Sequence, residues 1–549
     1  MSSTAADLIV ACLEAEGVDR AFCVPGESYL ATLDAFARRN RIELVQSRHE
    51  SGAGFMAVAD AKLTGRPGIA LVSRGPGATN ASIAVHTAEQ DAVPMILFIG
   101  QVARDELGRG AFQEVDYSRM FGEMAKAVWT IMDADRIPEI VSRAFQIACS
   151  GTPGPVVIVL PEDMQFDETT ARPLEPMAVS KVRAADQDLA RIGDMLARAE
   201  RPLIIAGGLL DHAAGRAALR AAAEKWSVPV ATSFKHQDIF PNELPLFAGH
   251  LGFNIPKPQV DLLSDSDLIL AIGTRLGDTT TQGYVFPSIP PAQTLIHVHP
   301  DANVVGRIFS ADLGLTVDPT LFLEALAQAG PTQQPDRQSW IGRIKDYIDG
   351  LMGGAPEPAD DGVNFGLVIE ALRPHLAEDA ILITDAGNFS SWVHRHIRLN
   401  GRQQMIGAVS GAMGMGTPAA VAAGLRCPDR QIITFLGDGG SMMTGNELAT
   451  AMAQGVKVKA FISNNGSYGT IRLHQEKFFP GTVAATPLVN PDFAKYGEAF
   501  GAKGVTITMQ DDIEAKVAEV MAHDGPVVVD VHSSLERISA FLSIADLKG

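Results

Sequence analysis

Short apolar runs alternate with helical patterns along the whole chain, and this alternation constrains the fold more than any other feature of the sequence. The runs span residues 68–73, 95–100, 155–160, 203–206, 229–232, 268–272, 294–298, 380–384, 431–436, 459–463 and 526–531. Two parallel strands need a long crossover between them, and a helix supplies it. The alternation therefore predicts βαβ units, that is, an α/β protein of open, mainly parallel sheets.

The alternation falls into three blocks, separated by polar stretches with prolines at residues 169–185 and 331–361. A chain of 549 residues is too long for one hydrophobic core. We therefore predict three domains, covering residues 1–170, 186–330 and 362–549. The first and third blocks carry the similar segments GIALVSRGPG and QIITFLGDGG, which favours two copies of one ancestral α/β domain.

Charge and cysteine content exclude several classes of function. The formal net charge is −19, whereas nucleic-acid binding needs clustered lysine and arginine. The four cysteines lie far apart without a CxxC spacing, which disfavours zinc sites and disulfides and favours a reducing compartment. No basic start precedes the first apolar run, and the longest uncharged stretch, residues 403–425, is rich in glycine. We expect a cytoplasmic protein with no export signal, membrane span or nucleic-acid partner.

The sharpest motif is FLGDGGSMMTGNEL, followed by AFISNNGSYGT. An apolar strand that ends in Gly437-Asp438-Gly439 places a carboxylate at the carboxyl edge of a sheet, where open α/β folds bind ligands. The glycines allow the backbone to approach a phosphate closely. Asp438 and Asn465 offer hard oxygen ligands that could share a magnesium ion with a diphosphate. An isolated GDG is usually a plain turn, but the following helix, strand and paired Asn favour the metal site.

This spacing resembles the diphosphate-binding signature of thiamine-diphosphate-dependent enzymes. The resemblance implies that Asp438, Asn465 and the main-chain carbonyl of Ser467 hold Mg²⁺. It also implies the order of a pyrimidine-binding, a middle and a diphosphate-binding domain. The residues that it assigns to cofactor binding are Pro25, Gly26, Glu50, Asn80, Gly387, Asn388, Phe389, Gly411, Met413, Gly437, Asp438, Gly439, Gly440, Asn465, Ser467, Tyr468, Gly469 and Thr470.

The segment SRHESGAGFMAVADAKLTGRPGIALVSRGPGATN is similar to the acetohydroxyacid synthase branch of that family. By itself, an acid at the start of a helix is most often a cap or a surface carboxylate. The resemblance implies instead that Glu50 is catalytic: it hydrogen-bonds the aminopyrimidine ring and so promotes removal of the thiazolium proton. A carboxylate does this when it is buried with one partner, and the apolar helix after it is expected to supply that setting.

Other segments match the same branch. In GAMGMGTPAA the glycines do not fit the nicotinamide pattern GxGxxG. The family's large apolar wedge against the cofactor falls there on Met413, although a methionine that merely fills a core gap is the alternative. Phe112 and Gln113, in GAFQEVD, fall on substrate-facing positions. Lys126 falls on the place of an active-site lysine.

The chain also departs from the branch. His474 stands where biosynthetic acetohydroxyacid synthases carry a tryptophan that shapes the pocket of the second 2-keto acid. His297 and His299 replace acids near the flavin of that branch. The middle block nevertheless leaves room for a nucleotide, and FAD stays an open alternative. The residues that leave this room are Gly207, Gly208, His250, Gly273 and Arg275.

The resemblance implies decarboxylation of a 2-keto acid such as pyruvate, and ligation of the activated aldehyde to an acceptor carbonyl. It also implies a homodimer with active sites at the interface, paired into a homotetramer, because Glu50 and Asp438 then come from different subunits. Three alternatives stay open: a lyase or decarboxylase for an acyl-CoA, a sulfoaldehyde or an aromatic 2-keto acid; a non-catalytic cofactor-binding paralogue; and a nicotinamide dehydrogenase. Glu50 disfavours a glyoxylate carboligase, and the lack of a His-His pair disfavours a simple pyruvate decarboxylase.

Overall fold

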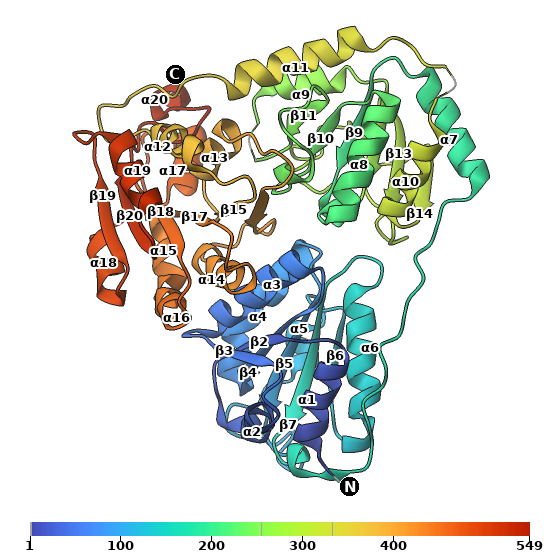
Figure 1. Cartoon of the computed structure of the whole chain (residues 1–549), viewed down its shortest axis with the longest axis vertical. Helices are drawn as coiled ribbons and strands as arrows, with labels where there is room; N and C mark the ends of the chain where they lie inside the picture. The colour runs from blue at the N-terminus through green and yellow to red at the C-terminus, as the bar shows by residue number, and fades with distance from the viewer. Residues whose placement is uncertain (1–2, 254, 332, 549) are drawn as a thin grey trace.

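The computed structural model describes residues 3–253, 255–331 and 333–548. Over these residues it contains three six-stranded parallel sheets, one in each predicted domain, and a two-stranded antiparallel sheet. Figure 1 shows the three sheets as separate lobes with helices on their faces. The prediction of an α/β fold with three open, parallel sheets is therefore confirmed.

The first domain orders its sheet as β3-β2-β4-β5-β7-β6, and the short strands β1 and β8 pair beside it. Its strands are β1 (Ser3–Thr4), β2 (Arg20–Cys23), β3 (Glu43–Gln46), β4 (Gly68–Ser73), β5 (Met95–Gln101), β6 (Ala127–Thr130), β7 (Pro155–Pro161) and β8 (Glu168–Thr169). Its helices are α1 (Ala5–Ala15), α2 (Leu30–Arg39), α3 (Glu50–Thr64), α4 (Arg74–Gln90), α5 (Tyr117–Phe121) and α6 (Ile137–Cys149), with the 3-10 helices η1 (Glu27–Tyr29), η2 (Ala134–Arg136) and η3 (Met164–Phe166).

The middle domain orders its sheet as β11-β10-β9-β12-β13-β14, the arrangement of a doubly wound nucleotide-binding fold. Its strands are β9 (Pro202–Ala206), β10 (Val230–Thr232), β11 (Phe247–His250), β12 (Leu268–Ile272), β13 (Thr294–His299) and β14 (Leu313–Thr316). Its helices are α7 (Asp186–Arg198), α8 (Ala213–Trp226), α9 (Lys257–Ser264), α10 (Pro319–Ala329) and α11 (Gln338–Met352), with η4 (Gly208–Leu210) and η5 (Gln237–Ile239).

The third domain orders its sheet as β16-β15-β17-β18-β20-β19. Its strands are β15 (Ile381–Thr384), β16 (Gln404–Gly407), β17 (Ile432–Gly437), β18 (Val458–Asn464), β19 (Lys503–Ile507) and β20 (Val527–His532). Its helices are α12 (Phe365–Leu372), α13 (Ser390–His396), α14 (Gly416–Arg426), α15 (Asp438–Thr444), α16 (Leu448–Ala453), α17 (Gly469–Phe478), α18 (Phe493–Phe500), α19 (Ile513–Ala522) and α20 (Ile544–Lys548), with η6 (Arg373–His375) and η7 (Gly445–Glu447).

The first and third domains share one hydrophobic core. Helices α3 and α14 pack against each other where the two domains meet (Figure 1), and residues of both sheets belong to the same buried cluster. Every side chain of α3 from Ser51 to Ala61 is buried, as expected for a helix that is apolar on all sides. The middle domain keeps a separate core.

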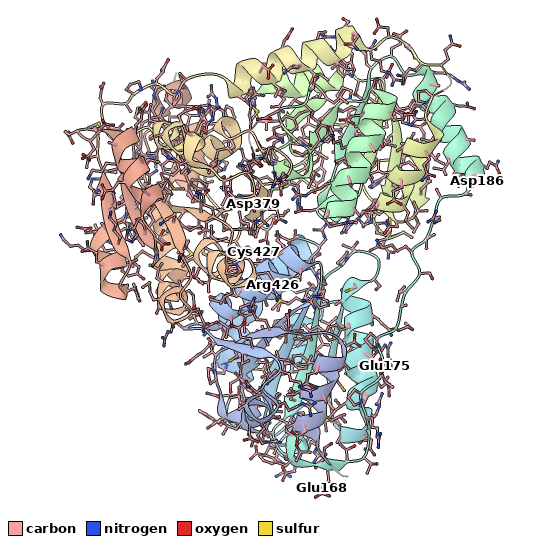
Figure 2. The ribbon with its side chains drawn as sticks, viewed as in Figure 1. Glu168, Glu175, Asp186, Asp379, Arg426 and Cys427 are labelled. Carbon is pink, nitrogen blue, oxygen red and sulfur yellow. The ribbon has the colours of Figure 1, made fainter. Side chains whose placement is uncertain are left out.

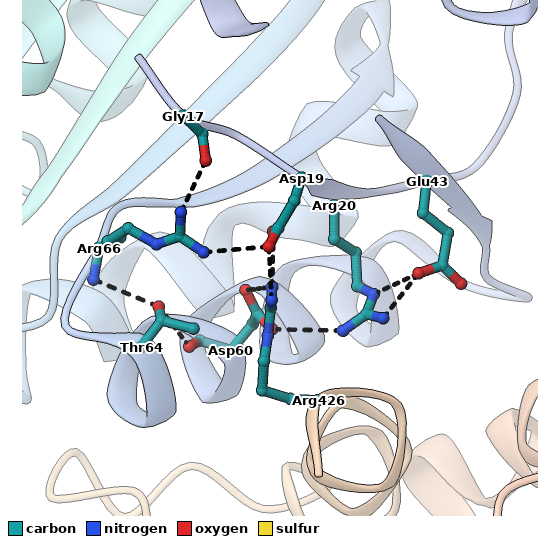
Figure 3. A network of polar contacts seen from close by, with 8 residues as sticks. All are labelled: Gly17, Asp19, Arg20, Glu43, Asp60, Thr64, Arg66 and Arg426. Carbon is teal, nitrogen blue, oxygen red and sulfur yellow. Dashed lines mark hydrogen bonds and ion pairs between the residues drawn. The ribbon is translucent and has the colours of Figure 1, made fainter. Parts of the chain in front are cut away.

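A network of ion pairs connects the first and third domains where they meet. Arg426 at the end of α14 donates to both carboxylate oxygens of Asp19 and of Asp60, at 2.8 to 2.9 Å (Figure 3). Arg66 and Arg20 add contacts to the same two carboxylates. Arg426 and Cys427 lie between the two lobes in Figure 2. The network therefore joins residues of two domains that are 366 and 407 positions apart in the sequence.

The two predicted connecting stretches behave differently. Residues 170–185 form no helix or strand and run along the outside of the molecule, from near Glu168 past Glu175 to Asp186 in Figure 2. The second stretch contains α11, whose Trp340 donates to the carbonyl of Pro202 at 3.0 Å inside the core of the middle domain. That core therefore extends beyond residue 330. Among the described residues, no helix is long and apolar enough to cross a membrane.

Candidate functional site

Asp438 is the first residue of α15, directly after β17, as the GDG motif predicts. Its side chain is buried, and burial raises the pKa of its carboxyl. Oδ1 accepts a hydrogen bond from the N–H of Gly439 at 2.8 Å, and Oδ2 accepts from the N–H of Ser467 at 3.2 Å. These donors keep the carboxylate at the carboxyl edge of the third sheet and favour its charged form.

Asn465 and Ser467 reach the same edge from the end of β18. Asn465 Oδ1 accepts from Ser467 N at 3.1 Å, so the carboxylate of Asp438 and the amide oxygen of Asn465 meet at one N–H. The sequence did not indicate Asn490, which donates to Asp438 Oδ2 and to Asn464 Oδ1, each at 2.9 Å. Asn490 lies in a segment without helix or strand and carries no motif, so only the folded chain reveals it.

The loop between β15 and α13 lies against the start of α17. The N–H of Asn388 donates to Thr470 Oγ1 at 2.9 Å. A Cβ on Gly469 would lie 2.8 Å from Asn388 Oδ1 and 3.1 Å from Asn465 Nδ2, so this position has no room for a side chain. The ring of Phe389 is buried and packs edge-on against Phe365. The loop therefore offers mainly backbone groups to the site.

The glycine-rich loop before α14 is held by a buried carboxylate that the sequence did not single out. Asp385 accepts hydrogen bonds from the N–H groups of Gly414 and Met415 at 2.9 to 3.2 Å and of Ala386 at 2.9 Å. Burial raises the pKa of Asp385 to about 6. This anchoring fixes the loop that carries Met413, whose methyl group lies 3.4 Å from the Cβ position of Gly439. Met413 thus lies over the start of α15.

These elements line a cavity of about 430 Å³ between the third and middle domains. The predicted residues that line it are Gly387, Asn388, Phe389, Gly411, Met413, Gly437, Asp438, Gly439, Gly440, Asn465, Ser467, Tyr468, Gly469 and Thr470. The structure therefore brings together all the residues that were assigned to the diphosphate half. The rest of the lining comes partly from the middle domain, with Phe234, Phe247 and Phe253 among its members, and partly from further residues of the third domain such as Leu473 and Phe541.

Basic residues also line the cavity: Lys235 and His250 come from the middle domain, and His394 and Arg395 come from the third domain. Lys235 donates from Nζ to Thr384 Oγ1 at 2.9 Å, and its backbone N–H donates to His250 Nε2 at 3.0 Å. The rings of His250 and His394 stack with centroids 4.2 Å apart. Burial lowers the pKa of Lys235 to about 8 and that of His250 to about 3, and it lowers the pKa of His394 as well. Both imidazoles are therefore neutral near pH 7.

Glu50 lies on the first domain, outside this cavity. It is the first residue of α3, and its Oε2 accepts a hydrogen bond from Asn80 Nδ2 at 2.9 Å. The segment GPGATN forms the first turns of α4, which turns Asn80 toward Glu50. The expectation that the apolar helix would bury Glu50 is wrong for a single chain, because Glu50 is only half-buried and Asn80 is exposed.

The other residues predicted on the first domain separate into two places. Pro25 and Gly26 follow β2 at the carboxyl edge, where a Cβ on Gly26 would lie 2.2 Å from Ser73 Cβ. Gln113 lies near them, since its carbonyl accepts from the N–H of Gly75 at 3.0 Å. Lys126 precedes β6 at the opposite, amino edge, where its Nζ donates to the carbonyl of Thr152 at 2.8 Å. The structure does not bring Lys126 to Glu50 within one chain.

The residues present fit magnesium and thiamine diphosphate. One carboxylate, one amide oxygen and one main-chain carbonyl are hard oxygen ligands, and so few charges leave room for diphosphate oxygens to complete the shell. The cavity beside them has tightly packed glycines and backbone N–H groups, which suit a phosphate. The two halves of the predicted site, at Asp438 and at Glu50, lie on separate edges of one chain (Figure 1).

Most of the residues considered for flavin binding make contacts with other residues of the protein. Arg275 contacts the first domain, where its Nη1 lies 3.3 Å from the carbonyl of Glu89. A Cβ on Gly207 would lie 2.3 Å from the carbonyl of Gly273, so this pair is packed backbone to backbone. His297 contacts the carbonyl of Thr274 at 2.9 Å. His474 lies in α17 with its ring centroid 6.0 Å from that of Phe253.

Comparison with known proteins covers almost the whole chain. Three family models match: the N-terminal TPP binding domain of thiamine pyrophosphate enzymes over residues 3–120, their central domain over residues 189–326, and their C-terminal TPP binding domain over residues 385–531. The acetolactate synthase large subunit of Parasynechococcus marenigrum is 32% identical over 533 residues, which are 95% of this chain and 86% of the relative. The isozyme 1 large subunit of Escherichia coli is 31% identical, over 97% and 94%. The mitochondrial catalytic subunit of Saccharomyces cerevisiae is 29% identical, over 94% and 78%.

Proposed function

The chain belongs to the thiamine pyrophosphate enzyme family, and on this premise we propose that it decarboxylates a 2-keto acid such as pyruvate and ligates the activated aldehyde to an acceptor carbonyl. The arrangement that supports this most is the single edge at which Asp438, Asn465 and Ser467 meet beside the cavity. Bound thiamine diphosphate would supply the electron sink that decarboxylation of a 2-keto acid requires.

Each part of the third domain has a proposed task. Asp438, Asn465 and the carbonyl of Ser467 hold Mg²⁺, and Asn490 orients the carboxylate through its 2.9 Å hydrogen bond. The backbone around Gly387 and Gly469 faces the diphosphate. Met413 lies on the glycine-rich loop that Asp385 anchors, and from there its side chain would contact the bound cofactor.

Glu50 is proposed to act on the cofactor that a second subunit holds. Within one chain it lies outside the cavity and is half-buried, which supports a dimer in which the partner covers Glu50 and Asn80. Once covered, the Glu50 carboxylate would keep its hydrogen bond from Asn80 and would be placed, with little water around it, to hold the proton that a bound aminopyrimidine ring exchanges. Pairing of two such dimers into a tetramer is part of the same proposal.

The cavity wall favours one further candidate among the acyl donors. Phe234, Phe247 and Phe253 of the middle domain, together with Phe541 of the third domain, make the cavity larger and more apolar than the methyl group of pyruvate needs. A decarboxylase or lyase for an aromatic 2-keto acid would use this wall directly, because aromatic side chains pack well against an aromatic substrate. Bound FAD in the same space is the competing occupant, and an absorption spectrum of the purified protein distinguishes the two.

The proposal is tested with purified protein, thiamine diphosphate, Mg²⁺ and pyruvate, following carbon dioxide and acetolactate in one sample. Acetolactate formation is expected. Release of carbon dioxide without acetolactate would mean that pyruvate is the donor but not the acceptor. Consumption of phenylpyruvate but not of pyruvate would favour an aromatic 2-keto acid as the donor. If no 2-keto acid is consumed although thiamine diphosphate binds in a Mg²⁺-dependent way, the reaction assignment fails and the cofactor assignment stands.

A further inference from the structure

Glu447 is a buried carboxylate that the proposed reaction does not use. It ends the 3-10 helix η7, which continues α15 from Asp438, and its side chain is fully buried. Oε1 accepts hydrogen bonds from the backbone N–H groups of Arg48 and His49, both at 3.0 Å, and Oε2 lies 3.2 Å from Arg48 N. Glu447 therefore binds the two residues that directly precede Glu50.

The contact is close enough to exclude any side chain on the facing turn of α3. A Cβ on Gly52 would lie 2.2 Å from Glu447 Oε1 and 2.7 Å from its carboxyl carbon. A glycine in the first turn of a helix is costly for helix formation, so its presence indicates a need for close approach. The carboxylate thus packs directly against the backbone of the turn that begins with Glu50.

The hydrogen-bond pattern favours the charged form of the Glu447 carboxyl group. Among the described residues, its hydrogen-bond partners are donors only, namely two backbone N–H groups and the hydroxyl of Thr450, which donates to Oε2 at 2.6 Å. Burial raises the pKa of the Glu447 carboxyl, and these donors offset that rise in part. The N–H groups of Arg48 and His49 lie before and at the N-cap of α3, where a negative charge also interacts favourably with the helix dipole.

We propose that Glu447 is a positioning residue: it fixes the backbone at residues 48–49 so that the Glu50 carboxylate points at its target, and it links that backbone to the helix that begins with Asp438. The catalytic importance of this link rests on the proposed function of Glu50. The same chain then holds, through one buried carboxylate, the segment that bears its metal ligand and the segment that bears its proton-transferring acid. A shift at one segment is passed directly to the other.

Two measurements on the Glu447→Gln variant test the link. The amide of glutamine keeps the size of the side chain and one acceptor oxygen but removes the negative charge and one oxygen, so the N–H groups of residues 48–49 lose charge-assisted hydrogen bonds and Arg48 N loses its 3.2 Å contact with Oε2. Backbone amides of residues 48–52 are expected to exchange hydrogen about tenfold or more faster, measured by mass spectrometry or NMR on the protein without cofactor. Thr450→Val, which removes only the hydroxyl donor to Oε2, is the matched control and should leave this exchange near that of the wild type.

The second measurement separates positioning from general damage. With thiamine diphosphate and Mg²⁺ bound, exchange of the thiazolium C2 proton should slow about tenfold in Glu447→Gln, while the calorimetric affinity for the cofactor changes less than about threefold. In a Glu50→Gln background the Glu447→Gln substitution should add nothing, because Glu447 acts only through Glu50. Should Glu447→Gln fail to fold, Gly52→Ala, which displaces the same carboxylate, is measured instead.

Unchanged amide exchange at residues 48–50, or effects of Glu447→Gln and Glu50→Gln that multiply in full, would overturn the proposal. If Glu50→Gln by itself leaves C2 proton exchange unchanged, the proposed role of Glu50 fails. Faster amide exchange in Glu447→Gln would then still establish the structural link, so the two failures are distinguishable.

Discussion

The first and third domains have the same strand order but opposite charges at one equivalent place. Counted from the first strand of each six-stranded sheet, both follow the order 2-1-3-4-6-5. The helix after the third strand begins with Arg74 in the first domain and with Asp438 in the third. The fold thus provides the same position twice, and the residue type decides what that position can hold.

The surroundings of these two residues differ accordingly. Arg74 pairs with Glu162 at 2.6 Å and with Glu27 at 3.3 Å, so its cation satisfies protein carboxylates at the edge. Asp438 is held by N–H donors, a pattern that favours the carboxylate and leaves it available to a cation. A guanidinium cannot bind a metal ion, whereas a carboxylate can. Of the two related edges, only that of the third domain suits Mg²⁺.

The largest effect is expected from a substitution of Asp438, the carboxylate that distinguishes the edge of the third domain from that of the first. Asp438→Ala should abolish Mg²⁺-dependent binding of thiamine diphosphate, with a loss of affinity of about 1,000-fold or more, because it removes the one charged side chain among the three proposed metal ligands. Isothermal titration calorimetry with and without Mg²⁺ measures it. Asn490→Ala, which removes a partner of the carboxylate but no ligand, should cost about tenfold. Equal affinities for wild type and Asp438→Ala would disprove the metal site.

The next prediction concerns the acid of the first domain. Glu50→Gln should lower kcat by about 10²- to 10³-fold, the usual range for loss of a proton-transferring group, with little change in cofactor affinity. Steady-state kinetics and calorimetry on the same preparation check this. Asn80→Ala, which removes the 2.9 Å donor to Glu50, should lower kcat by a smaller factor. An equally large loss of cofactor affinity in Glu50→Gln would contradict the prediction that Glu50 acts in proton transfer and not in holding the cofactor.

A third prediction uses the buried anchor of the glycine-rich loop. The pKa of Asp385 rises from 3.8 to about 6 in the folded protein. Because folding raises it, the contribution of this carboxyl to stability is full below pH 3.8 and is lost as the pH rises through 6. The loss amounts to about 3 kcal/mol, at 1.36 kcal/mol per pKa unit.

Urea unfolding of the wild type and of Asp385→Asn at pH 4 and at pH 7 measures this change. The stability of the wild type relative to the variant should fall by about that amount between the two pH values. A constant difference would mean that Asp385 titrates in the folded protein as it does in the unfolded chain.

The smallest expected effect tests the junction of the two domains. Arg426→Met removes the ion pairs to Asp19 and Asp60 and leaves the buried Asp60 with weaker partners. The free energy of unfolding should fall by about 1–3 kcal/mol. Arg343→Met on the middle domain, whose pair with Asp265 is about half exposed, should cost less than about 0.5 kcal/mol. Similar losses for both variants would argue against a shared core between the first and third domains.

The eleven predicted apolar runs each coincide with a strand to within one residue at either end. These strands lie mostly inside the sheets, where burial on both faces produces a continuous apolar run. The strands at the six outer edges of the sheets, such as β3, β6, β14 and β19, were not predicted. In β3, β6, β14 and β19 the side chains are partly exposed, so the sequences of these four strands are mixed and resemble loops.

The residues of the candidate site also fall into two groups, those that the sequence predicted and those that it missed. Motif residues at strand ends, such as Asp438 and Asn465, were predicted because a strand end and a polar residue are neighbours in the sequence. Asn490, Asp385 and Glu447 were missed. Each acts through partners that lie 26 to 399 residues away in the chain. No local pattern records such a contact.

The sequence by itself determined the three α/β domains, the family and the groups that meet at the edge of the third sheet. These follow from local alternation of apolar residues and from polar residues at strand ends. Only the tertiary structure decided the strand orders, the separation of Glu50 from the cavity, and the buried carboxylates that anchor the site. The physical reason is that packing of α3 against α14 brings distant segments together, and side-chain burial in that contact is a property of the whole folded chain.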